Sequence, residues 1–267
     1  MMESTVSTPS VMADAAWFDW ERREPYDNDE LCDRMLALVR NWFFATRHPL
    51  ALRLLDGGLS HDDLRFLAGQ EYWYFRCTIW WNAGKVLYAP APEIQRRLIG
   101  PLLEEVGATA ESHEHLYVRY LRGLGVTADH IDERMLLAGT ITYVHEIYSI
   151  NIAGDLVANL AANNLVVETM RPAQYARLVE VLRKHYGLDD AALTFFTEHI
   201  DADVGHGELG VQLLKELMTS VTHQRIAFAA LLRSLAARWQ FYDAVDAWIT
   251  RREGLLIPCW PTLPHMS

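Results

Sequence analysis

Hydrophobic residues recur at three- and four-residue spacings along most of the chain, which is the pattern of amphipathic α-helices. Runs that alternate between hydrophobic and polar residues, as strands do, are almost absent. We therefore predict an all-α fold, a single bundle with an interior that can hold a cofactor. The periodicity predicts about eight helical segments, at 29–48, 61–89, 92–107, 108–125, 127–170, 172–187, 189–220 and 223–252.

Capping residues, glycines and prolines mark the ends of these segments. Ser60 is placed to cap the second segment, and Pro172 suits the first turn of the sixth. The fifth segment is too long for one uncapped globular helix, so we predict a bend or break at Gly139 or Gly154. The predicted organisation is a flexible N-terminal arm at 1–25, a single helical domain at 26–255 and a C-terminal tail at 256–267.

Composition and charge restrict the classes of partner. Hydrophobic residues make up 51% of the 267 residues, enough for a sizeable core, and the formal net charge is −11. No Lys/Arg run stands out, which argues against nucleic acid or an anionic membrane surface as partner. No apolar run approaches the ~18–20 residues that cross a bilayer, and the N-terminus does not resemble a secretory signal. Cys32, Cys77 and Cys259 form no CxxC pair, so we expect a reducing, cytoplasmic location.

The stretch FFTEHIDADVGHGE at 195–208 concentrates metal-binding types of side chain in one predicted helix. His199, Asp203 and His206 stand at i, i+4 and i+7, so the second and third point about 40° and −20° from the first and all three share one stripe. The other three acids of the stretch, Glu198, Asp201 and Glu208, fall off this stripe, and we expect them to be solvated or to support the ligands from outside. Because an isolated carboxylate is costly to bury, the stripe is either a metal site or a wet polar face.

Two further segments carry groups of the same chemistry. Glu105 and His113 flank a kink expected at Gly107. The alternative is that the acids here only interact favourably with the dipole at the start of a helix. Glu168 follows a long apolar run and precedes Pro172. The alternative is that Glu168 only marks the point where the helix reaches water. Glu146, in YVHEIYS, is the rival carboxylate.

Together these segments resemble the haem-oxygenase-like di-iron oxidases and oxygenases, which are related in fold to thiaminase-type and pyrroloquinoline-quinone-synthase proteins. The resemblance covers most of residues 30–220 and rests on an ordered set: a Glu and a His around EEVG, a lone Glu, and then His-x3-Asp-x2-His. It favours Glu168 over Glu146, because Glu168 lies about thirty residues before the last motif. The metal ligands that the resemblance implies are Glu105, His113, Glu168, His199, Asp203 and His206.

The resemblance implies a haem-oxygenase-like bundle with two iron ions in its core and O2 as co-substrate. A donor set of three carboxylates and three imidazoles without thiolate also suits iron, with manganese as the alternative ion, and disfavours structural zinc. It implies no catalytic residue beyond the ligands. The expected partner is a small-molecule substrate, and both an external electron donor and a homodimer are compatible with this expectation.

The expected activity is N-oxygenation of a small amine or amino-acid-like metabolite in a biosynthetic pathway. The alternatives are oxidative C–C cleavage or desaturation of an amino or fatty acid, and, in other classes, a metal-free helical enzyme or an interaction protein. Some N-oxygenating relatives carry an additional carboxylate ligand before the first Glu, but the corresponding stretch FRCTIWWNAGKV has no acid, and Glu71 lies further back.

Aromatic and basic residues near these segments are candidates for binding the substrate. Trp80, Trp81 and Tyr143 could line a substrate pocket, with core packing as the alternative for each. Arg171 could hold a substrate carboxylate, although the spacing does not choose between it and Arg76 or Lys85.

Overall fold

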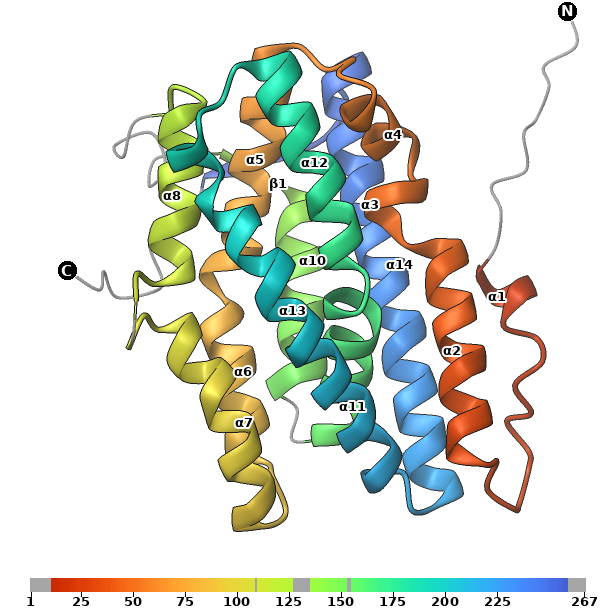
Figure 1. Ribbon diagram of the computed structural model, residues 1–267. Helices are drawn as coiled ribbons and strands as arrows, with labels where there is room; N and C mark the ends of the chain where they lie inside the picture. Colours follow the sequence, from red (N-terminus) through yellow and green to blue (C-terminus); the bar gives the residue numbers. More distant parts are fainter. Residues whose placement is uncertain (1–10, 109, 127–134, 153–154, 259–267) are drawn as a thin grey trace, which may run out of the picture.

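The computed structural model describes residues 11–108, 110–126, 135–152 and 155–258 (Figure 1). Their regular structure is almost entirely helical, as the hydrophobic periodicity predicts. The elements are α1 (Val11–Asp14), α2 (Asn28–Trp42), α3 (Phe44–Arg47), α4 (Pro49–Leu55), α5 (His61–Arg76), α6 (Thr78–Leu87), α7 (Pro92–Glu105), α8 (His113–Gly123), β1 (Met135–Leu137), α10 (Ala138–Ile152), α11 (Leu156–Asn159), η1 (Leu160–Glu168), α12 (Arg171–Tyr186), α13 (Asp190–Leu217), α14 (Val221–Arg251) and β2 (Leu256–Pro258).

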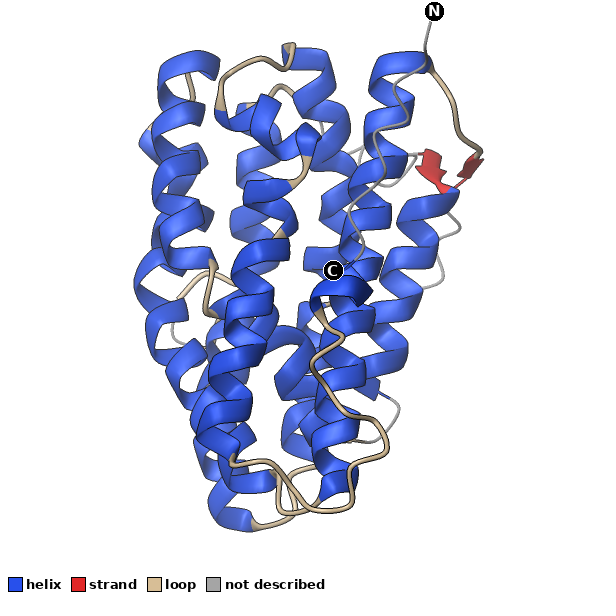
Figure 2. Cartoon of the chain, turned by 90° about the vertical axis from the view of Figure 1, so that its right-hand side faces the viewer, coloured by secondary structure: helices blue, strands red, loops and turns tan. Residues whose placement is uncertain are grey.

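The long helices run side by side along one direction, as Figures 1 and 2 show from two sides. A π-helical segment, η1, packs against both α13 and α14, and every residue from Leu160 to Val167 is buried. Helix α13 also packs against α8 and α12, and α14 against α10. The last residue of η1 is Glu168. Because η1 packs between α13 and α14, this carboxylate lies inside the bundle.

Several predicted segments are divided further than the periodicity indicated. The segment 61–89 breaks at Cys77 into α5 and α6, where the Thr78 hydroxyl donates to the carbonyl of Phe75 (2.7 Å). Such a side-chain bond competes with the helical ladder and favours a bend. The segment 127–170 contains α10, α11 and η1. Gly139 is the second residue of α10, directly after the change from β1 to α10, and Gly154 lies outside the described residues.

Sequence periodicity did not predict the small antiparallel sheet. Strand β1 pairs with β2, with Leu136 opposite Ile257, so part of the segment predicted to be helical and the start of the predicted tail form a ladder. Three-residue strands are too short to show an alternating pattern.

The described part of the predicted N-terminal arm packs on the bundle. The Phe18 ring stacks on Phe228 with centroids 4.2 Å apart, and the Trp42 indole donates to Asp14 (2.8 Å). Residues 1–10 lie outside the described residues. Among the helices that are described, none is both long and apolar enough to cross a membrane.

Candidate metal centre

All six predicted ligands line one cavity of about 40 Å³, which we call the carboxylate–histidine cavity. They come from the end of α7, the start of α8, the end of η1 and the middle of α13. The structure therefore brings together side chains that are up to a hundred residues apart in sequence. The cavity is lined by Glu105, His113, Glu168, His199, Asp203 and His206 together with Tyr74, Thr78, Trp81, Asn82, Lys85, Pro101, Asn163, Val167 and Arg171.

A tight turn brings Glu105 and His113 together, as the predicted kink required. Gly107 has φ = +75°, and a Cβ there would lie 2.5 Å from the backbone nitrogen of Ser112, so the turn needs glycine. Ser112 then caps α8. As a result, Nδ1 of His113 lies 2.9 Å from Oε2 of Glu105, and the Thr78 hydroxyl hydrogen-bonds the other carboxylate oxygen.

Helix α13 presents His199, Asp203 and His206 on one stripe, as their spacing predicts. His199 and Asp203 are buried, whereas Glu198, Asp201 and Glu208 are exposed. Nδ1 of His199 lies 2.6 Å from the carbonyl oxygen of Phe195. When Nδ1 donates that bond, the lone pair lies on Nε2, which is the arrangement typical of metal-binding histidines.

Glu168 reaches the cavity because η1 and α13 approach closely. A Cβ on Gly210 would lie 2.1 Å from Cβ of Asn164, and Asn164 donates to Oε2 of Glu168 (2.5 Å). The other oxygen, Oε1, lies 3.2 Å from Nζ of the buried Lys85. The rival carboxylate Glu146 does not line the cavity and instead pairs with Arg233 (2.7 Å).

The electrostatics of the cavity favour the ionised forms of Glu105 and Asp203. Burial opposes ionisation of Glu105 and Asp203, but His113, which hydrogen-bonds Glu105, and His206, whose Nδ1 lies 3.8 Å from Oδ1 of Asp203, hold the pKa of each carboxyl below its ordinary value. Although burial acts against a charged imidazole, Glu105 raises the pKa of His113, and Asp203 raises that of His206. Burial lowers the pKa of His199 to about 4, so this imidazole is neutral at pH 7.

Each carboxylate faces a cationic side chain or an imidazole. Glu168 pairs with Lys85, Asp203 lies 3.7 Å from Arg171, and Glu105 faces His113. With these pairs formed, no three histidine, cysteine or acidic side chains among the described residues are gathered as a ready-made ion site. Two observations nevertheless fit a metal. Oδ2 of Asp203 is buried without a hydrogen-bond partner, and the donor set mixes carboxylates with imidazoles.

Some cavity residues were not assigned a role by sequence reasoning. Lys85 was considered only as a holder of a substrate carboxylate, but it pairs with Glu168. Glu104 does not line the cavity and is exposed, but its Oε2 lies 3.0 Å from Nε2 of His206. Thr78 carried no signal in the sequence, because its role depends on the break at Cys77.

The four candidate substrate-binding residues are distributed unevenly. Trp81 lines the carboxylate–histidine cavity, and Tyr143 lines a neighbouring cavity. Arg171 lines both. Trp80 is exposed and lines neither of them.

Sequence comparisons find related proteins. A family model described as an iron-containing redox enzyme matches residues 65–239. The 4-chloro-allylglycine synthase of Streptantibioticus cattleyicolor is 26% identical over 257 residues, which cover 90% of each chain.

Solved structures share the fold. A TenA homologue from Pseudomonas syringae aligns with a TM-score of 0.69 and 14% identity, over 90% of this chain and 97% of that one. A domain of unknown function with a haem-oxygenase-like fold from Shewanella denitrificans aligns with a TM-score of 0.68 and 17% identity, over 83% and 92% of the two chains. The predicted haem-oxygenase-like fold is thus confirmed.

Proposed function

The chain belongs to the family of iron-containing redox enzymes, and from this premise we propose that it binds two iron ions in the carboxylate–histidine cavity and uses O2 to oxidise a small amino acid. The proposed reaction is a desaturation that leaves an unsaturated amino acid. Manganese is the alternative ion.

One observation carries the proposal, which is the convergence of three carboxylates and three imidazoles from four segments on one cavity. Three carboxylates balance most of the charge of two divalent ions. Oxygen and nitrogen donors without thiolate suit iron better than structural zinc. The six side chains Glu105, His113, Glu168, His199, Asp203 and His206 would hold the ions.

The protein contributes charge, orientation and exclusion of water. Iron supplies the one-electron chemistry that O2 requires. His199 stays neutral, with Nε2 free to bind a metal, because Nδ1 is engaged by Phe195. Lys85 and Arg171 compensate Glu168 and Asp203 until metal ions do so. Desaturation removes two electrons and two protons from the amino acid, and an external donor supplies the other two electrons that reduce O2 to water.

The choice of an amino acid as substrate rests on the relative from Streptantibioticus cattleyicolor. Its name describes a product that is a chlorinated amino acid with a carbon–carbon double bond. N-oxygenation, the activity expected from sequence, stays a prediction. Support for it is weaker, because α6 contributes Thr78, Trp81, Asn82 and Lys85 to the cavity lining but no additional carboxylate.

Anaerobic reconstitution with Fe(II) tests the proposal. We expect the wild-type chain to retain about two iron ions per chain after gel filtration, and the His199→Ala/His206→Ala variant to retain none. His115→Ala is the matched control, because His115 is exposed and does not line the cavity. An iron content that is equal in the wild-type and double-variant proteins would favour a metal-free enzyme or an interaction protein.

The substrate class is tested separately by O2 consumption of the Fe(II)-loaded protein. Amino acids are expected to accelerate it and to give unsaturated products by mass spectrometry. Acceleration by simple amines, with hydroxylamine or nitro products, would favour N-oxygenation instead.

A further inference from the structure

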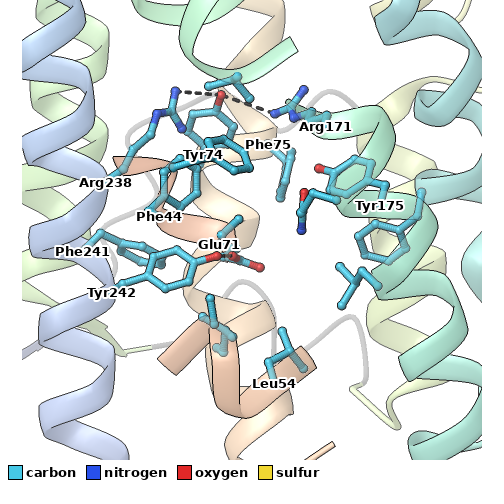
Figure 3. A pocket seen from close by; sticks show the side chains of 18 of the residues that line it. Phe44, Leu54, Glu71, Tyr74, Phe75, Arg171, Tyr175, Arg238, Phe241 and Tyr242 are labelled. Carbon is cyan, nitrogen blue, oxygen red and sulfur yellow. Dashed lines mark hydrogen bonds between the residues drawn. The ribbon is translucent and has the colours of Figure 1, made fainter. Parts of the chain in front are cut away.

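A second cavity, of about 60 Å³, adjoins the first, and we call it the aromatic cavity (Figure 3). The two cavities share Tyr74, Val167 and Arg171 as a common wall. Most of the remaining lining is aromatic or aliphatic and comes from α3, α4, α5, α12, α13 and α14. Two charged side chains besides Arg171 line it, Glu71 and Arg238, and the proposed oxidation does not use either of them.

Glu71 is a carboxylate without a cationic partner. It accepts hydrogen bonds from the hydroxyls of Tyr242 (3.0 Å) and Tyr117 (3.4 Å), which are neutral groups. No lysine, arginine or histidine among the described residues forms an ion pair with it. Burial raises its pKa to about 7. A buried carboxylate is costly unless it is paired, so its position in a cavity points to a cationic ligand.

Arg238 presents the opposite charge in the same cavity. It is only 1% exposed, and its guanidinium donates to the oxygens of Tyr143 (2.7 Å) and Tyr74 (3.1 Å). No carboxylate among the residues that the structure covers pairs with it. Arg171 donates to the same Tyr74 oxygen (3.4 Å), so two guanidinium nitrogens lie within roughly 6.5 Å of each other. Arg171 already faces Asp203 (3.7 Å), whereas Arg238 has no anion beside it among the described residues, and a buried cation in this position favours one.

The two arginines and Glu71 lie in different parts of the aromatic cavity. Figure 3 shows the two arginines on either side of Tyr74 at one end of the view, with Glu71 further down among the aromatic side chains. Glu71 and Tyr74 stand at i and i+3 on α5, so they lie on the same face about one turn apart. An α-amino acid carries a carboxylate and an ammonium group on the same carbon atom, so it presents one group to each kind of side chain.

We propose that the aromatic cavity binds the head group of an α-amino acid, with Glu71 on its ammonium, Arg238 and Arg171 on its carboxylate, and its side chain directed past Tyr74 into the carboxylate–histidine cavity. This deepens the proposed function and rests on its amino-acid substrate, but it does not require iron. Glu71 and Arg238 are then residues that determine specificity.

The sizes of the two cavities limit the amino acid. A cavity needs about 10–15 Å³ to hold one water molecule, so cavities of 60 and 40 Å³ hold on the order of eight water-sized groups. A small amino acid with a short, unbranched side chain has a comparable number of heavy atoms. Bulky aromatic amino acids and long-chain fatty acids are expected to be excluded.

The ionisation of Glu71 gives the proposal a pH signature. Its charged or titratable neighbours from the packed elements are Arg171 and Tyr175 on α12, Tyr117 and Tyr120 on α8, Tyr143 on α10 and Tyr242 on α14. Arg238 on α14 lines the same cavity. Burial raises the pKa of these tyrosines, so among these neighbours none changes charge near pH 7 as Glu71 does. The affinity for an ammonium group is therefore expected to rise about tenfold from pH 6 to pH 8.

Calorimetric titration of metal-free protein tests the assignment without any oxidation. The probes are the twenty common L-amino acids and L-norleucine, followed by hexanoate and 1-aminopentane. Hexanoate is norleucine without its ammonium group, and 1-aminopentane is norleucine without its carboxylate. At pH 8, Glu71→Gln is expected to weaken amino-acid binding at least tenfold and to leave hexanoate binding unchanged. Glu180→Gln, an exposed change on α12, is the matched control, and thermal unfolding verifies that each variant is folded.

The outcomes separate this proposal from the oxidation. If no amino acid binds the wild-type protein more tightly than it binds Glu71→Gln, the head-group assignment is wrong, even if iron binds and O2 is consumed. If amino acids bind with the expected dependence on Glu71 but the protein takes up no iron, the assignment holds and the proposed oxidation fails. Equal loss of hexanoate and norleucine affinity in Glu71→Gln would indicate a general distortion and would also overturn the assignment.

Discussion

The two adjoining cavities differ in how their charges are compensated. In the carboxylate–histidine cavity each acid faces a cation or an imidazole, as Glu168 faces Lys85. In the aromatic cavity Glu71 and Arg238 bond only to neutral groups among the described residues. A compensated site gains a metal ion only by displacing its own cations, whereas an uncompensated site is ready for a charged ligand. The first cavity is thus suited to replacing its own cations with metal ions, and the second to binding a charged ligand.

The largest effect is expected from removing a carboxylate of the first cavity. Glu168→Ala should lower the affinity for Fe(II) at least about a hundredfold, because the loss of a ligand costs more than the loss of a supporting contact. Iron content and O2 consumption after anaerobic loading measure this. If Glu168→Ala retained the full iron content, Glu168 would not be a metal ligand.

Removing the internal cation should destabilise the metal-free protein. Lys85→Met leaves the carboxylate of Glu168 buried without its cation, which should lower the free energy of unfolding by about 3 kcal/mol. Lys215→Met, which breaks an exposed pair with Asp29, should cost no more than about 1 kcal/mol. Urea unfolding with and without Fe(II) provides the comparison. Fe(II) should stabilise Lys85→Met more than the wild-type protein, and equal stabilisation would contradict competition between Lys85 and metal.

The uncompensated acid of the second cavity should make stability depend on pH. Burial raises the pKa of folded Glu71 to about 7, above its ordinary value of 4.5, so the folded state keeps a proton that the unfolded state has lost. Stability should therefore fall as the pH rises from about 4.5 to 7, by up to about 3 kcal/mol. Glu71→Gln should lack this decrease and should be more stable than the wild-type protein at pH 8. Parallel curves for both proteins would show that Glu71 is not the group responsible.

Two glycines of α13 should respond in opposite ways to alanine. Gly210→Ala forces a methyl group against Asn164 and should cost about 1–3 kcal/mol, while also disturbing the bond from Asn164 to Glu168. Gly205 has no atom within 4 Å of the added Cβ, so Gly205→Ala should stabilise the helix by about 0.5–1 kcal/mol. Thermal unfolding measures both changes. If Gly210→Ala left the stability unchanged, η1 and α13 could move apart without a loss of stability.

The smallest effect is expected at the rival carboxylate. Glu146→Ala removes a partly exposed pair with Arg233 and should change stability by less than about 1 kcal/mol. Iron content should stay at the wild-type value. A loss of iron in Glu146→Ala would reverse the assignment of the central carboxylate.

The sequence predicted the helical fold because hydrophobic periodicity is strong in long helices such as α13 and α14. It also located the turn at Gly107 and the stripe at His199, Asp203 and His206, since both depend on local spacing. The break at Cys77 escaped prediction because it depends on one hydroxyl, and the π-helix η1 because its apolar run has no distinctive composition. The pairing of Lys85 with Glu168 and the cavity position of Glu71 depend on tertiary contacts between distant elements.

Arg171 belongs to the walls of both cavities, where it approaches Asp203 on one side and shares Tyr74 with Arg238 on the other. Anything that draws its guanidinium toward one cavity changes the charge in the other. Thermodynamic linkage then makes the two occupancies reciprocal, so the factor by which a bound amino acid changes the affinity for iron equals the factor by which iron changes the affinity for that amino acid. A single arginine in the dividing wall therefore gives the protein a means of coordinating the filling of its two cavities.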